Sequence, residues 1–169
     1  MMKLASPSVA AHLIRTALLV VFLLASPALR AAEEGSRGEI IYVPIYSSVF
    51  YQDGKRTLEL AATLSIHNVD LQNSITVEKV DYYNTKGELI RKHLDKPVVL
   101  KPLETKNFVI AKEDTTGGTG ANFLVEWQSP DQPVNSPIVE ALMISAGSGQ
   151  GISFTTAGRV IKKLDAGAK

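Results

Sequence analysis

The sequence predicts an all-β protein, an antiparallel β-sandwich that is immunoglobulin-like in the broad sense and preceded by a cleaved signal peptide. About eight or nine short runs rich in β-branched and aromatic residues follow one another at a spacing of roughly 8 to 12 residues, which is typical of a sandwich, with a closed barrel as the alternative. Clusters of proline, glycine, asparagine and aspartate separate these runs. Past the N-terminus no segment shows sustained helical periodicity with caps, although "PIVEALMIS" is ambiguous.

The first 31 residues have the pattern of a secretory signal peptide. Lys3 and Arg15 precede the apolar stretch "TALLVVFLLA", and the small residues of "SPALRAA" follow it. The uncharged stretch between Arg15 and Arg30 is shorter than the about 20 residues of a membrane-spanning helix, so a permanent anchor is the less favoured interpretation. Cleavage after Ala28 or Ala31 fits the preference for small residues. We therefore expect a periplasmic or extracellular protein that meets the membrane only through the uncleaved signal segment.

Charge and cysteine content exclude several classes of protein. Loss of residues 1–31 leaves all 17 acidic residues and removes three of the 18 basic ones, so 15 − 17 gives a formal charge of −2. A nucleic-acid partner is therefore not expected. The chain has no cysteine, which excludes disulfides, thiol catalysis, cysteine zinc sites and iron–sulfur clusters. The expected organisation is a flexible linker at 32–38, one β-sandwich domain at 39–161 and a flexible tail at 162–169, with no cofactor.

The first strands of the domain are predicted from composition and from alternation. "IIYVPIY" (40–46) is rich in β-branched and aromatic residues, but Pro44 cannot donate a hydrogen bond, which favours an edge strand. "SSVFYQDGKRT" contains a turn signal at Asp53 and Gly54. The next run, "LELAATLSIHN", alternates and predicts a half-buried strand. Five apolar residues share its buried face: Leu58, Leu60, Ala62, Leu64 and Ile66.

A hairpin and five further strands complete the predicted domain. "ITVEKVDYY", "NTKG" and "ELIRKHL" form the hairpin, in whose loop Asn84 and Gly87 are expected to take left-handed backbone angles. His93 is in phase with Leu89 and Arg91 and is expected to face solvent. The other runs are "KPVVLKP", "ETKNFVIAK", "ANFLVEWQS", "PIVEALMIS" and "GISFTT".

Three segments, "VDYYNTKG", "GGTGANFLVEW" and "QGISF", resemble a family of bacterial exported proteins known only as a domain of unknown function, DUF3124-like. The resemblance covers most of residues 39–161. It implies a bacterial and periplasmic protein, and it brings neither an activity nor a binding residue.

The glycine-rich segment "EDTTGGTGANFLVEW" (113–127) departs from a phosphate-binding loop. Such a loop closes onto a helix and has a lysine after its glycines, whereas here the glycines lead into a strand. Phe123, Val125 and Trp127 alternate with residues that include Glu126, so we expect the first set inside and Glu126 outside. The favoured interpretation is a long hairpin loop whose glycines take positive φ, and a recognition loop is the alternative.

No catalytic or metal constellation is complete in the sequence. "SAGSGQG" (145–151) lacks the glycines of a nucleophile elbow around Ser148, and only His67 and His93 remain to serve it. "NVDLQN" and "EDTT" offer oxygens for a calcium ion, but ordinary asparagine- and aspartate-rich turns are the favoured interpretation. We therefore expect no catalytic residue and no metal ligand.

The leading hypothesis is an exported, non-enzymatic β-sandwich that binds another envelope protein or stabilises an envelope assembly through its loops and an edge strand. The alternative is a module that binds a sugar, a lipid fragment or a cation, and an envelope hydrolase comes third. Consecutive strand residues face opposite sides, so at least one tyrosine of "DYY" is expected at the surface or against a polar partner. The candidate binding residues are Tyr82, Thr115, Thr116, Gly117, Gly118, Asn122 and Glu126. The sequence leaves the oligomeric state open.

Overall fold

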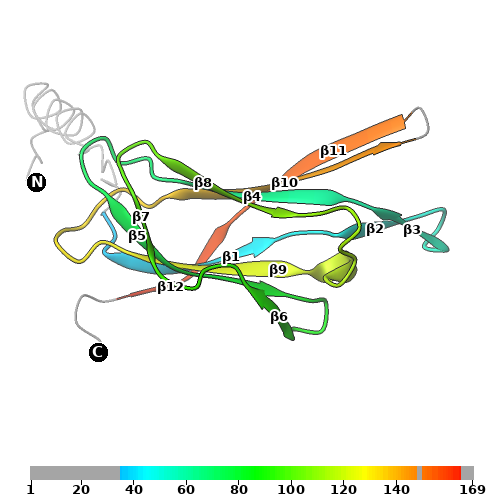
Figure 1. Ribbon diagram of the computed structural model, residues 1–169, viewed down its shortest axis with the longest axis horizontal. Helices are drawn as coiled ribbons and strands as arrows, with labels where there is room; N and C mark the ends of the chain where they lie inside the picture. Colours follow the sequence, from blue (N-terminus) through cyan, green and yellow to red (C-terminus); the bar gives the residue numbers. More distant parts are fainter. Residues whose placement is uncertain (1–34, 148–149, 165–169) are drawn as a thin grey trace, which may run out of the picture. The chain divides into compact units, whose positions relative to one another are not determined.

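The protein is built from antiparallel β-strands, as Figure 1 shows. The structure is a computed structural model and describes residues 35–147 and 150–164. The strands are β1 (Gly38–Pro44), β2 (Ser48–Tyr51), β3 (Arg56–Glu59), β4 (Ala61–His67), β5 (Ile75–Tyr83), β6 (Leu89–Lys92), β7 (Val98–Leu100), β8 (Thr105–Ile110), β9 (Asn122–Gln128), β10 (Ile138–Gly147), β11 (Gln150–Ala157) and β12 (Arg159–Lys163), with one 3-10 turn, η1 (Gly118–Gly120). The all-β prediction is confirmed, and the predicted signal peptide lies outside the described residues.

The strands form two large open sheets and one small one. The six-stranded sheet has the order β12-β1-β9-β5-β6, with β7 also paired to β5. The four-stranded sheet has the order β11-β10-β4-β8, and β2 pairs with β3 alone. All of these pairings are antiparallel. Because neither large sheet returns to its first strand, the barrel alternative is excluded.

One hydrophobic core is built from the inward faces of both large sheets. On β4 and just before it, the predicted alternation holds, and Leu60, Ala62, Leu64 and Ile66 are buried. Phe123, Val125 and Trp127 of β9 are also buried, as predicted, while Glu126 is only half-buried. The full core is Ile41, Val43, Ile45, Leu60, Ala62, Leu64, Ile66, Ile75, Val77, Val80, Tyr82, Leu100, Phe108, Ile110, Ala121, Phe123, Val125, Trp127, Val134, Val139, Ala141 and Met143. Burial of each large apolar side chain contributes about 1.5–3 kcal/mol.

The prediction that the strand containing Pro44 lies at a sheet edge is wrong. β1 pairs with β9 on one side and with β12 on the other, so it is an interior strand. Proline is tolerated because it is the last residue of β1 and because β12 begins at Arg159, opposite Tyr42. Pro44 therefore lies past the end of the β12 ladder, where its missing N–H is not needed.

The prediction that residues 113–121 form a hairpin loop is also wrong. β8 pairs with β4 in the four-stranded sheet, whereas β9 pairs with β1 and β5 in the six-stranded sheet. The segment that joins them is therefore a crossover between the two sheets. Another crossover runs from β11 to β12 at Gly158, whose N–H donates to the carbonyl of Val139 at 2.7 Å.

The two predicted turns form, with one difference. Gln52, Asp53 and Gly54 take φ of 49°, 57° and 79° between β2 and β3. Between β5 and β6, Gly87 has φ of 78°, as predicted, but Asn84 is not left-handed. Asn84 instead makes an Asx turn, since its Oδ1 accepts from the N–H groups of Lys86 and Glu88 at 2.9 and 3.0 Å.

Strand pairing extends into both segments that the sequence predicted to be flexible. Ser36 bridges Val134, and Gly38 already belongs to β1. At the other end, Lys162 and Lys163 belong to β12, and the N–H of Leu164 donates to the carbonyl of Gly38 at 2.8 Å. The ordered pairing therefore exceeds the predicted 39–161 at both ends.

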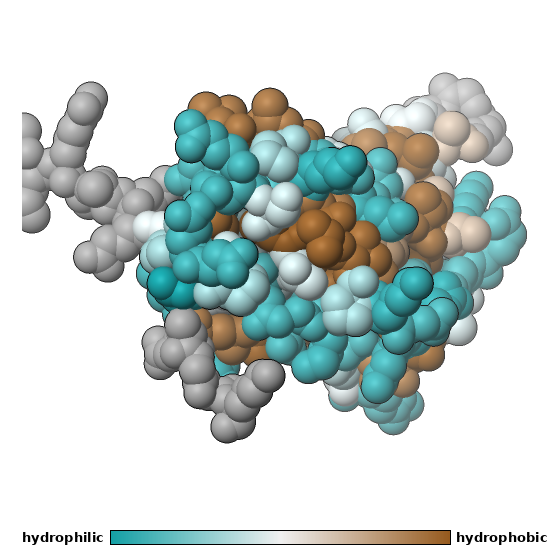
Figure 2. Space-filling model, turned by 60° about the vertical axis from the view of Figure 1, so that its left-hand side comes forward, coloured by the Kyte–Doolittle hydropathy of each residue, from teal (hydrophilic) through white to brown (hydrophobic). Residues whose placement is uncertain are grey.

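Some large apolar side chains lie at the surface. On the side drawn in Figure 2, apolar residues gather in separate patches between polar ones. Across the described residues the exposed ones are Phe50, Tyr51, Leu71, Leu89, Val99, Leu103, Val109, Ile138, Leu142, Ile144, Val160 and Ile161. Four of them, Val109, Ile138, Leu142 and Ile144, belong to strands of the four-stranded sheet.

Candidate functional site

The predicted ligand residues do not assemble into one site. Tyr82 points into the core and is fully buried, next to Phe123 on the paired strand. Asn122 and Glu126 occupy the opposite, half-buried face of β9. Glu126 is occupied there by Lys79, whose Nζ lies 2.8 Å from Oε2, and this partner raises the pKa of Lys79. Tyr82 is thus separated from the other two residues by the sheet itself.

The four candidate residues of the glycine loop, Thr115 to Gly118, lie together, and the backbone of this loop is held by its neighbours. The carbonyl of Gly117 accepts from both the N–H and the hydroxyl of Thr85, each at 3.0 Å. Gly118, with φ of 76°, donates its N–H to the hydroxyl of Ser47 at 2.7 Å. These contacts tie residues 111–121 to the β5–β6 turn and to the segment before β2. The polar backbone of the loop is therefore used inside the molecule.

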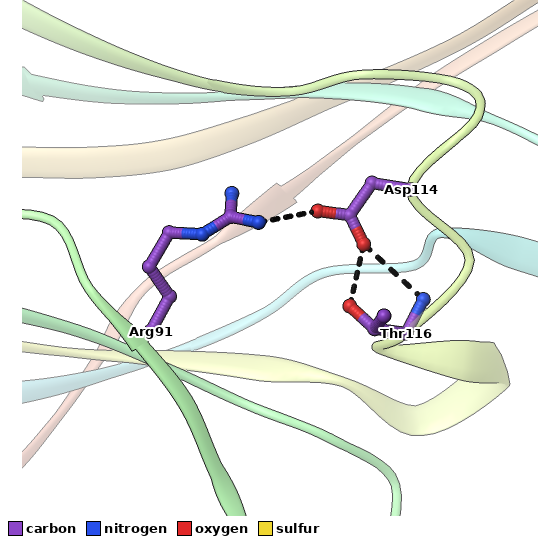
Figure 3. A network of polar contacts seen from close by, with 3 residues as sticks. All are labelled: Arg91, Asp114 and Thr116. Atoms are coloured by element: carbon purple, nitrogen blue, oxygen red, sulfur yellow. Dashed lines mark hydrogen bonds and ion pairs between the residues drawn. The ribbon is translucent and has the colours of Figure 1, made fainter.

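An ion pair joins the same loop to β6, as Figure 3 shows. Arg91 Nη2 donates to Asp114 Oδ2 at 2.9 Å. Asp114 Oδ1 accepts from both the N–H and the hydroxyl of Thr116. The Thr116 hydroxyl, with a smaller contribution from Arg91, holds the pKa of Asp114 below its ordinary value. Asp114 therefore joins the loop to β6 rather than offering free oxygens to a calcium ion.

An aromatic cluster lies beneath this loop, and the sequence did not predict it. His93 packs edge-on against Phe108 at 5.7 Å between ring centroids and against Phe123 at 5.4 Å, so it joins the two large sheets. Tyr82 packs on Phe123 at 5.0 Å. Nε2 of His93 and the hydroxyl of Tyr82 are buried without a hydrogen-bond partner. Burial lowers the pKa of the His93 imidazole and raises the pKa of the Tyr82 hydroxyl, so both groups are neutral near pH 7.

The prediction that His93 faces solvent is therefore wrong. β6 ends at Lys92, and the chain bends at His93, whose N–H donates to the carbonyl of Val80 at 2.9 Å. An irregular register within β6 explains this, since Leu89 pairs with the outward Tyr83 whereas Arg91 pairs with the inward Tyr82. His93 follows Arg91 in phase, so the imidazole lies on the inner face of the sheet. Two tyrosines behave as predicted in direction, since Tyr82 points inward and Tyr83 lies on the other face, half-buried.

The second proposed calcium segment, "NVDLQN", is a turn whose polar groups are paired. Asp70 Oδ1 accepts from the N–H of Gln72 and from the N–H and side chain of Asn73, and Oδ2 accepts from the N–H of Asn135. The backbone donors of Gln72 and Asn73 lower the pKa of Asp70. Asn68 donates to the carbonyls of Asn73, Leu100 and Lys101. Within residues 35–147 and 150–164, no group of three or more histidine and acidic side chains is placed to hold a metal ion.

The outer face of the four-stranded sheet differs from the rest of the surface because it is nearly free of charge. Its outward positions in the described strands are Ala61, Thr63, Ser65, His67, Thr105, Asn107, Val109, Ile138, Glu140, Leu142, Ile144, Ala146, Gly151, Ser153, Thr155 and Ala157. Glu140 carries the one carboxylate among them, and His67 lies 3.7 Å from it. No lysine or arginine occurs at these positions.

Exposed apolar side chains run across the middle of this uncharged face. Leu142 pairs with Thr63, and Thr63 pairs with Val109, so these residues form one row across three strands. Ile144 lies two residues further along β10, next to Ala61. Val109 is 61% exposed, Leu142 42% and Ile144 45%, so this face, which has few charges, presents exposed apolar side chains among small polar ones. The alternation of the strands predicted polar residues on the outer face of the sheet. The sequence did indicate this face, because "PIVEALMIS" has apolar residues at both the inward and the outward positions of the strand.

Comparison with known proteins gives a family but no activity. The family model described as "Protein of unknown function (DUF3124)" matches residues 38–161. The chain belongs to this family. The resemblance predicted from "VDYYNTKG", "GGTGANFLVEW" and "QGISF" is thereby confirmed. No curated protein matches the chain.

A solved structure from Thermotoga maritima is similar to part of this family member. Its title is "Crystal Structure of Thermotoga maritima 1070", and the similarity has a TM-score of 0.44 with 13% sequence identity. It covers 77% of this chain and 98% of the Thermotoga chain. In the described part of the DUF3124 chain, no helix is long and apolar enough to cross a membrane.

Proposed function

We propose that the chain is an exported, non-enzymatic β-sandwich, immunoglobulin-like in the broad sense, that binds another envelope protein through the outer face of its four-stranded sheet. The observation that carries this proposal is the near absence of charge on that face, together with exposed Val109, Leu142 and Ile144. Export to the periplasm or beyond rests on the N-terminal pattern of Lys3, Arg15 and the apolar stretch that follows them.

The proposed surface is a sheet face rather than the loops and the edge strand that the sequence favoured. The backbone of the 111–121 loop is occupied by Ser47 and Thr85, and its carboxylate Asp114 is occupied by Arg91. The strand expected at the edge, β1, is covered by β12. The four-stranded sheet, in contrast, has nothing packed on its outer face among the described residues, since its outward side chains are exposed or half-buried.

The chemistry of this face favours a protein partner. The centres of protein interfaces are depleted in lysine, aspartate and glutamate, as this face is. Four strands at about 4.8 Å and seven residues at about 3.4 Å give a flat area of about 19 by 24 Å, or roughly 460 Å². This whole face, polar positions included, is a little over half of the about 800 Å² that each partner buries in a standard interface. A partner must therefore also contact surface beyond one copy of this sheet.

The two other hypotheses have less support. A ligand site at Tyr82, Asn122 and Glu126 would need residues from opposite faces of the six-stranded sheet. A hydrolase needs a nucleophile with a base, and the histidine with the most perturbed environment, His93, is enclosed by Tyr82, Phe108 and Phe123. Ser148, the serine of the glycine loop, lies outside the described residues.

A charge placed on the face tests the proposal. Leu142→Glu puts a carboxylate in the centre of the face, and Leu89→Glu makes the same change at a leucine of similar exposure, 46% against 42%, on β6 of the other sheet. After gentle crosslinking in the source cells and affinity capture, we expect the Leu142 variant to lose its partner and the Leu89 variant to keep it. Equal capture by both variants would contradict the proposal.

A further inference from the structure

The sheet edges of this protein differ in their protection against the addition of another strand. An edge strand offers a row of unpaired N–H and C=O groups, and proteins usually block it with charges, prolines, bulges or short length. In the six-stranded sheet, β12 carries Arg159, Lys162 and Lys163. At the opposite edge, β6 has four residues that include Arg91 and Lys92, and the paired strand β5 has an irregular register beside it.

The remaining edges, apart from one, are protected in the same ways. β7 has three residues and stands between Pro97 and Pro102. β8, one edge of the four-stranded sheet, carries the exposed Lys106. The β2–β3 hairpin has strands of four residues, and β3 contains Arg56 and Glu59.

β11, the other edge of the four-stranded sheet, has none of these devices. Its eight residues, "QGISFTTA", contain no charge and no proline. It pairs with β10 on one side and with no strand of the described chain on the other. Its sequence is rich in residues that favour strands, and Ile152 and Phe154 on its inner side are only half-buried. A strand added at this edge would cover those two side chains further.

We infer that β11 is a site of strand addition and that its occupant is β11 of a second copy of the chain, paired antiparallel about a two-fold axis. This inference deepens the proposed function, on which it rests. A two-fold pairing sets a strand against itself, so a charge near the middle of the strand lies close to the same charge on the copy. β11 has no such charge, whereas β12, β6 and β8 do.

The pairing also enlarges the uncharged face. The order of strands across the junction is β10, β11, β11 of the copy and β10 of the copy, so the two β10 strands lie about 14 Å apart, three strand spacings. Leu142 and Ile144 of both copies then lie on one continuous eight-stranded face. Such a face has about twice the area of the single one, which brings it to the size of a standard interface. Strand pairing alone buries less than a standard interface, so we expect a weak dimer that dissociates at micromolar concentration.

The test is analytical ultracentrifugation of the purified, full-length expressed chain over about 1 to 300 μM, a range that spans the expected dissociation constant. Ser153→Lys places a charge on the exposed face of β11, at the junction. Asn107→Lys is the matched control, because it places the same charge on the same face at the opposite edge, on β8. We expect a concentration-dependent dimer that Ser153→Lys weakens about tenfold or more and that Asn107→Lys leaves unchanged.

Two results would overturn the inference: a chain that stays monomeric over the whole range, or a dimer that both variants weaken equally. Failure of this inference is distinguishable from failure of the proposed function, because one experiment measures self-association of the purified chain and the other measures capture of a different protein. A monomer that still loses its partner through Leu142→Glu would leave the proposed function standing alone.

Discussion

Replacement of Gly117 by alanine is the perturbation whose effect the structure defines most closely. A Cβ at this position would lie 1.9 Å from the hydroxyl oxygen of Tyr82, 2.7 Å from its Cζ and 2.8 Å from Cβ of Ala121. Ordinary contact begins near 3.4 Å, so a gap of 3.4 − 1.9 = 1.5 Å must open. Tyr82 is fully buried against Phe123, so the loop has to lift instead.

The cost follows from the contacts that the lifted loop loses. The carbonyl of Gly117 accepts two hydrogen bonds from Thr85 at 3.0 Å, each worth about 0.5–1.5 kcal/mol. Their loss gives about 1–3 kcal/mol, the same as the usual cost of forcing extra atoms into a packed site. Urea denaturation followed by the fluorescence of Trp127, the single tryptophan, measures this free energy of unfolding.

Two further variants separate this explanation from a general effect of alanine in the loop. Gly120→Ala meets only the Thr85 side chain, whose methyl group lies 3.2 Å away and has to shift by a few tenths of an ångström, so we expect it to cost less than about 1 kcal/mol. Tyr82→Phe removes a buried hydroxyl that lies near the Ser47 side chain without a hydrogen bond of good geometry, so we expect little loss of stability. The same change should recover part of the cost of Gly117→Ala, about 1 kcal/mol. If Gly117→Ala costs no more than Gly120→Ala, or if Tyr82→Phe recovers nothing, the packing argument is wrong.

Three other predictions follow from buried groups. Because burial lowers the pKa of His93, the unfolded chain takes up a proton below about pH 6.5 more readily than the folded chain does. The free energy of unfolding should therefore decrease as the pH is lowered below about 6.5, by at most about 1.4 kcal/mol per pH unit for this group. Urea denaturation at several pH values should show a shallower fall for His93→Gln, and an identical fall would contradict the assignment. Glu39→Ala removes the acceptor of the Trp127 ring N–H (3.2 Å) and the Ser136 hydroxyl (2.9 Å), so it should cost about 1–3 kcal/mol by denaturation, and an unchanged midpoint would count against this role. Gly158→Ala places a Cβ 2.7 Å from the Ile41 side chain, so the melting temperature should fall. Gly54→Asn is the control, because Gly54 has open space around it and asparagine tolerates its positive φ, and we expect the melting temperature of this variant to stay nearly unchanged.

The alternation of apolar and polar residues predicted the strands well, because it depends only on neighbouring residues in the sequence. The alternation from Leu60 to Ile66 became β4, and the alternation from Phe123 to Trp127 became β9, since one face of each strand is buried. "PIVEALMIS" was ambiguous because its apolar residues occupy both phases, and only its pairing with β4 and β11 makes it a strand. The same residues form part of the exposed apolar face.

What failed depended on contacts between residues far apart in the sequence. Pro44 indicated an edge, but the partner on that side, β12, comes from the end of the chain and starts opposite Tyr42. His93 was placed outside because the sequence does not show the irregular register between β5 and β6, which moves Arg91 and His93 to the face of the buried Tyr82. The candidate residues Tyr82 and Asn122 were grouped by residue type, and the register of β5 against β9 places them on opposite faces. Sheet order and register are set by tertiary packing, which one sequence does not display.

The central claim is that the uncharged face of the four-stranded sheet is the contact surface, and a two-dimensional amide NMR titration tests it most directly. The domain of residues 33–169 would be titrated with envelope extract, separated by size into small molecules and proteins. We predict that the protein fraction broadens signals first at Thr63, Asn107 and Leu142, and that the small-molecule fraction changes nothing. Sharp shifts with the small-molecule fraction, or broadening confined to residues 111–121, would contradict the claim.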